Sequence, residues 1–100
     1  MADDTTDSKA EMAFFEIADQ FINLANELAK TQGTANVGTA LRYAAARYNT
    51  FEASLSSDDL ARDETKMTDM LCNDFREMLK ANMQDYIARQ RQQATPANDE

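Results

Sequence analysis

Apolar residues recur every three or four positions between Ala13 and Ala29, which is the spacing of one face of an α-helix. They form two adjacent stripes, Phe14, Ile17, Phe21, Leu24 and Leu28 in one, and Phe15, Ala18, Ile22, Ala25 and Ala29 in the other. A surface helix usually needs an apolar arc of only about 100°. Because this arc covers much more, the pattern predicts a central helix that contacts two neighbouring elements at once.

Start and stop signals bound this first helix to about residues 9–31. The run Ser-Lys-Ala-Glu from Ser8 to Glu11 is a capping box, in which the hydroxyl and the carboxylate satisfy backbone N–H groups at the helix start. Lys30 suits the negative end of the helix dipole, and Gly33 is the natural residue for a left-handed cap. Residues 1–7 are predicted to form a disordered arm.

A second helix is predicted over about residues 36–55. Its apolar face has a small middle, which lets a partner helix come close, and it consists of Val37, Ala40, Leu41, Ala44, Ala45, Tyr48, Phe51 and Leu55. Gly38 lies near its start and costs up to about 1 kcal/mol of helix propensity, so we expect a frayed first turn or a tight contact there.

The run SLSSDD over residues 54–59 separates this helix from a third, predicted over about residues 58–91, with Ser56 or Ser57 as its cap. The apolar seam of the third helix consists of Leu60, Met67, Leu71, Phe75 and Met78, continued by Leu79, Asn82, Met83 and Tyr86. Asp58 with Arg62, and Asp85 with Arg89, have the spacing of favourable ion pairs on a helix. Residues 92–100 contain the single proline and are predicted to be a loose tail.

The predicted fold class is all-α: one domain over residues 8–91, arranged as a three-helix antiparallel bundle with a long third helix. At about 1.5 Å per residue the third helix outreaches the other two. Its last turns carry Met83, Tyr86 and Ile87, which would have no cover within one chain. We therefore expect the bundle to form a homodimer.

Composition and charge restrict the cellular compartment and the kinds of partner that fit this chain. The chain has 100 residues and a net charge of −8, of which −5 lies in the two tails, so residues 8–91 are nearly balanced. There is no basic patch, which argues against nucleic-acid binding, and no apolar run of membrane-spanning length or signal-peptide pattern. A single cysteine, Cys72, fits a reducing compartment. These observations predict a cytoplasmic protein without membrane association.

The sequence lacks most of the residues and motifs that enzymes use for catalysis. There is no histidine and one cysteine, which excludes histidine-dependent nucleophile arrangements, any zinc site with a histidine ligand, and a four-thiolate metal site within one chain. No phosphate-binding glycine motif is present. Glu16, Asp19 and Glu27 lie on the polar side of the first helix and fit a solvated face. We expect no enzyme activity, no catalytic residue, no cofactor and no metal site.

Two sets of residues are candidates for binding. Met70, Met83, Tyr86 and Ile87 are the candidate interface, since methionine is frequent at adaptable binding surfaces, although it more often fills core gaps. Arg42, Tyr43, Arg47, Asn49, Asn23 and Asn26 are the candidate anion or ligand groove, although exposed arginines in ordinary surface pairs are the commoner case. Cys72 is interpreted as a small, partly buried apolar residue, with a redox-sensitive thiol as the alternative.

Two segments resemble a known family. FINLANELAK (Phe21–Lys30) and AAARYNTFEAS (Ala44–Ser54) are similar to a small bacterial family catalogued only as a domain of unknown function. The resemblance covers about residues 13–88 and implies an intact bacterial domain, but no activity, cofactor or site residue. The function expected is a non-enzymatic helical interaction module that binds itself or another protein, and the alternative is a small-ligand or anion-binding helical protein.

Overall fold

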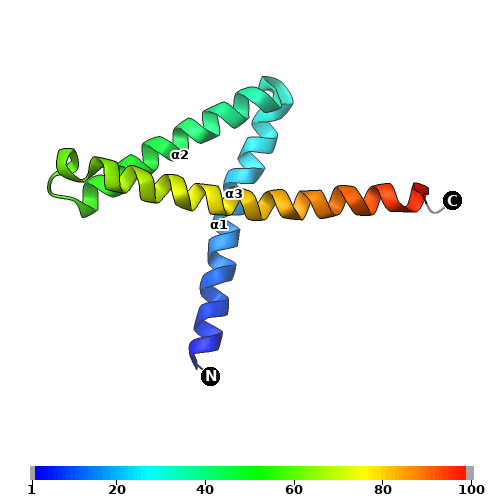
Figure 1. Cartoon of the computed structure of the whole chain (residues 1–100), viewed down its shortest axis with the longest axis horizontal. Helices are drawn as coiled ribbons and strands as arrows, with labels where there is room; N and C mark the ends of the chain where they lie inside the picture. Colours follow the sequence, from blue (N-terminus) through cyan, green and yellow to red (C-terminus); the bar gives the residue numbers. More distant parts are fainter. Residues whose placement is uncertain (1, 99–100) are drawn as a thin grey trace. The chain divides into compact units, whose positions relative to one another are not determined.

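The computed structural model describes the backbone of residues 2–98 and the side chains of residues 8–94. Over these residues the chain forms three helices and no strand: α1 (Ala2–Gln32), α2 (Thr34–Ser56) and α3 (Leu60–Asn98) (Figure 1). The prediction of an all-α chain with three helices and a long third helix is confirmed. The backbone of residues 2–7 belongs to α1 and that of residues 92–98 to α3. The side chains of residues 1–7 and 95–100 lie outside the described residues, so the predicted disorder of the arm, 1–7, and of the tail, 92–100, stays a prediction.

The capping box does not mark a helix end. Helix α1 runs through Ser8 and Glu11 from Ala2, so the predicted start near Lys9 is wrong. No glycine or proline occurs between Ala2 and Gln32, and therefore nothing in that stretch breaks the backbone ladder.

Gly33 alone joins α1 to α2 and turns the chain sharply (Figure 1). Its φ of 87° lies in the left-handed region, where glycine carries no side-chain penalty. The Gly33 N–H donates to Ala29 O over 3.0 Å, and the Gly33 carbonyl accepts from Val37 N over 3.1 Å. The Asn36 side chain donates to Gln32 O over 2.9 Å. One residue thus closes α1 and opens α2, which confirms the predicted left-handed cap.

Residues 57–59 join α2 to α3, and Asp59 is the cap of α3. Its carboxylate accepts from the backbone N–H of Arg62 over 3.1 Å, and its carbonyl accepts from Asp63 N over 3.1 Å. These are the side-chain and main-chain bonds of an N-cap residue. The predicted caps, Ser56 and Ser57, are wrong in that role because α2 includes Ser56, and the Ser57 hydroxyl binds the Asp59 N–H and the Asp63 carboxylate instead of an N–H within the first turn of α3.

The chain forms two compact units, residues 1–48 and residues 49–100, and the boundary falls inside α2. In the first unit, the apolar side chains near the Gly33 corner, Leu28 and Leu41, are 45% and 38% exposed, and those farther along α1 are more exposed. In the second unit, Leu60 and Leu71 near the start of α3 are 38% and 39% exposed and Tyr86 near its far end is 62% exposed, whereas the neighbouring Ile87, predicted to have no cover, is half-buried.

No side chain among the described residues is buried. Phe15 and Ile22 of α1, which were predicted to pack against a second neighbour, are 59% and 50% exposed. The prediction that both stripes of this helix are covered is therefore wrong. Within its unit α1 has one neighbouring helix segment, residues 34–48, which is shorter than α1 and meets it at the corner, so the apolar residues far from Gly33 stay open.

Candidate functional site

Large exposed apolar side chains line a broad face of α3 in the second unit. At 3.6 residues per turn, the large apolar side chains from Leu60 to Met78 form one stripe at steps of three, four or seven, and those from Leu79 to Tyr86 continue it in a stripe that is rotated by about 100° round the helix. They are Leu60, Met67, Leu71, Phe75, Met78, Leu79, Met83 and Tyr86, and we call them the α3 strip. Polar residues at Glu64 and Asn82 fall on the same line.

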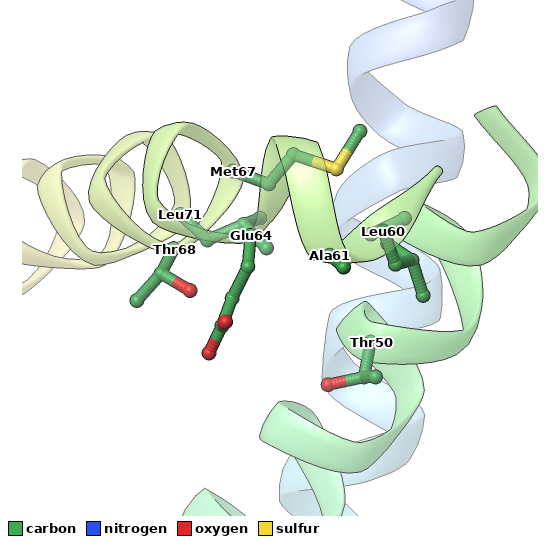
Figure 2. Close-up of a pocket in the computed structure, with 8 residues that line it drawn as sticks. Thr50, Leu60, Ala61, Glu64, Met67, Thr68 and Leu71 are labelled. Atoms are coloured by element: carbon green, nitrogen blue, oxygen red, sulfur yellow. The ribbon is translucent and has the colours of Figure 1, made fainter. Parts of the chain in front are cut away.

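The beginning of the α3 strip lies beside the end of α2. A shallow depression of about 360 Å³ is lined by Thr50 and Ala53 of α2 and by residues of the first turns of α3 from Leu60 to Leu71. Figure 2 shows the carboxylate of Glu64 reaching out from α3 on the side where Thr50 lies. The depression therefore joins an apolar floor to one carboxylate and two hydroxyl groups, those of Thr50 and Thr68.

An ion-pair cluster fixes the start of α3. The Arg62 guanidinium donates to both carboxylate oxygens of Asp63, over 2.8 and 2.9 Å, and to Asp58 over 2.9 Å. The Ser57 hydroxyl donates to Asp63 Oδ2 over 2.7 Å and accepts from the backbone N–H of Asp59 over 3.1 Å. Arg62 first, and then Ser57, stabilise the charged carboxylate, which lowers the pKa of Asp63 from 3.8 to about 2. Asp63, and to a smaller extent Asp58, raise the pKa of Arg62.

The depressed pKa of Asp63 predicts a defined acid response. Because the charged form is favoured in the folded chain, the cluster contributes stability above about pH 4, where an unfolded aspartate is ionised, and loses it as the pH falls toward 2. A ¹³C NMR titration of the carboxyl groups should place Asp63 near 2.

The Ser57→Ala variant should raise the pKa of Asp63 but leave it below 3.8, since the stronger Arg62 contact remains. Arg62→Gln should raise the same pKa further. An Asp63 pKa that is unchanged by both substitutions would contradict the cluster.

The predicted Asp58–Arg62 and Asp85–Arg89 pairs are confirmed at 2.9 and 3.0 Å.

The structure divides the predicted interface residues. Met83 and Tyr86 belong to the α3 strip, and Ile87 lies at its margin. Met70 lies outside the strip, about 60° round the helix from Met67, and is 61% exposed. The sequence interpretation left out Phe75, Met78 and Leu79 because it assigned them to a bundle core. Their roles in binding, like those of the predicted set, stay predictions.

The predicted groove residues make local contacts. Arg42 donates to the Thr39 hydroxyl over 3.2 Å, and Asn49 donates to Glu52 over 2.7 Å, each along α2. Asn23 and Asn26 belong to α1, and Tyr43 and Arg47 to α2, in the first unit, whereas Asn49 belongs to the second. The anion or ligand groove therefore stays a prediction from the sequence.

The thiol of Cys72 is exposed, so its interpretation as partly buried is wrong. Among the residues that the structure describes, no group of three or more acidic or cysteine side chains could hold a metal ion. In the same part of the chain, no helix is both long and apolar enough to cross a bilayer.

Comparison with known proteins places the chain in a family. No curated protein and no solved structure matches it. A family model described as "Protein of unknown function (DUF3144)" matches residues 14–87, a range that includes the α1–α2 corner, the Asp59 cap and the strip as far as Tyr86. The expected relation to a family of unknown function is confirmed, and the chain belongs to the DUF3144 family.

Proposed function

We propose that this protein is a non-catalytic helical interaction module of the bacterial cytoplasm, and that it acts first of all by associating with itself. The observation that carries the proposal is the exposure of large apolar side chains along both α1 and α3. Contiguous apolar surface of this kind marks interaction sites on helical proteins. The single cysteine fits a reducing compartment.

The kind of contact follows from the shape of the exposed surface. Each apolar face follows one side of a helix, so the matching partner is another amphipathic helix laid along it. A second copy of the chain supplies such helices with the same spacing, and paired copies with two-fold symmetry are the commonest oligomers.

Solution mass tests the proposal. Sedimentation equilibrium at micromolar concentrations should give a mass about twice the 11.2 kDa of one chain, and the midpoint of thermal unfolding should rise with protein concentration, as linkage requires for an associating chain. A mass of one chain at every concentration, together with a thermal-unfolding midpoint that does not depend on concentration, would contradict self-association.

A further inference from the structure

The α3 strip continues beyond the part that α2 can reach within the second unit. That unit contains only residues 49–56 of α2, a length of about 12 Å, whereas α3 extends over about 50 Å from residue 60 to residue 94. Leu60 at the covered end is 38% exposed, Met78 in the middle 51% and Tyr86 near the far end 62%. The strip from Phe75 to Tyr86 therefore requires cover from another element.

Charge divides α3 into two halves. Residues 60–77 carry five acidic and three basic side chains, a net charge of −2, and residues 78–94 carry one acidic and three basic side chains, a net charge of +2. The sign changes between Glu77 and Lys80, which is also the middle of the exposed part of the strip. A partner that matches α3 must therefore be basic where α3 is acidic and acidic where α3 is basic.

A second α3 in the opposite direction has this pattern. If a two-fold axis passes between Met78 and Leu79, the acidic half of each copy faces the basic half of the other. Leu71 then faces Tyr86, and Arg89 comes within one helical turn of Glu64 of the second copy. A parallel pair would instead place Glu64 beside Glu64 and Arg89 beside Arg89 on the strip itself. Charges that flank helix seams set the orientation of pairing in this way.

We propose that two copies of this chain pair through their α3 strips in antiparallel orientation, about a two-fold axis at Met78 and Leu79. The inference rests on the proposed self-association and adds the surface, the orientation and the register. Its occupant is a second α3, selected by charge complementarity along the helix and by the coincidence of the charge boundary with the centre of the apolar strip.

Disulfide trapping tests the register. In the full chain carrying Cys72→Ser, Met78→Cys should form a disulfide-linked dimer on mild oxidation, because residues next to the axis meet their own copies at bonding distance. Leu71→Cys alone should stay unlinked. A mixture of the Leu71→Cys and Tyr86→Cys chains should give a mixed dimer, identified by its mass under non-reducing conditions.

A pair of methionine variants tests the surface. Met78→Glu places a charge on the strip and should weaken dimerisation about tenfold or more, whereas Met70→Glu, the same substitution at a position outside the strip, should change the dissociation constant less than twofold. Circular dichroism shows whether each variant keeps its helices, and the trapping experiment places no charge on the strip.

The outcomes separate the two proposals. A wild-type chain that sediments as a monomer removes self-association and the pairing together. A wild-type dimer in which Leu71→Cys links to itself overturns the antiparallel orientation but leaves self-association standing. The third outcome is a wild-type dimer in which none of the α3 cysteines forms a disulfide and Met78→Glu has no effect on the dissociation constant. It would show that the copies associate through another surface, and it would overturn the α3 pairing while self-association stands.

Discussion

Gly33→Ala should lower the free energy of unfolding by about 1–2 kcal/mol, and Gly38→Ala should raise it by about 0.5–1 kcal/mol. The two substitutions are chemically identical and lie five positions apart, but the backbone differs. Gly33 has a φ of 87°, whereas Gly38 lies inside α2. Alanine pays a conformational penalty in the left-handed region and gains helix propensity in the right-handed one.

Steric contact does not complicate this comparison. A Cβ added at Gly33 would meet nothing within 4 Å, and one added at Gly38 would meet only Arg42 Nη1, at 3.8 Å. Of the two alternatives expected at Gly38, a frayed first turn or a tight contact, the tight contact is therefore wrong. Each effect should come from the backbone alone. Urea denaturation followed by circular dichroism, at one fixed protein concentration, measures both.

Gly33→Asn is the matched control, because asparagine tolerates the left-handed conformation better than alanine. Its cost should fall between zero and that of Gly33→Ala. If Gly33→Ala were neutral, or if both alanine variants changed stability in the same direction, the left-handed corner would not be what joins α1 to α2.

The corner illustrates what the sequence does determine. Gly33 was predictable because only one residue type adopts a positive φ without penalty, so a lone glycine between two apolar periodic stretches has few other roles. The ion pairs at Asp58–Arg62 and Asp85–Arg89 were predictable for a similar reason, since residues four apart on a helix are neighbours whatever surrounds them. Both predictions depend only on the local geometry of the backbone and of the helix.

The element that covers each apolar helix face could not be predicted from local spacing. Periodicity identifies which side of a helix is apolar, but it gives no information on whether the covering element comes from the same chain or from a second one. Phe15 and Ile22 were therefore assigned to an interior and are exposed. Phe75 and Met78 were placed in the seam of a bundle for the same reason, and only their exposure shows that this part of the seam is not covered.

The cap of α3 could be predicted only in part. Both Ser57 and Asp59 are good cap residues, and the choice between them depends on where α2 ends, which the run SLSSDD leaves open. The Ser57–Asp63 hydrogen bond joins residues six positions apart across the connection. No helical spacing predicts such a bond, so the cluster that lowers the pKa of Asp63 could be found only in the structure.

Asp59→Ala should lower the free energy of unfolding by about 1 kcal/mol, with a range of about 0.5–2 kcal/mol, because it removes the N-cap of α3. The Asp59 carboxylate accepts from the backbone N–H of Arg62 at 3.1 Å. Without this acceptor the Arg62 N–H in the first turn of the longest helix loses its hydrogen-bond partner.

Asp58→Ala is the matched control for this substitution. It removes the same charge one position earlier, near the same end of the helix dipole, and it deletes only an exposed ion pair with Arg62, of the kind that contributes a few tenths of a kcal/mol. The difference between the two variants isolates the cap from the charge. Asp59→Asn should keep most of the wild-type stability, since an amide oxygen also caps. Equal losses for Asp58→Ala and Asp59→Ala would show that charge, and not the hydrogen bond to Arg62, holds the start of α3.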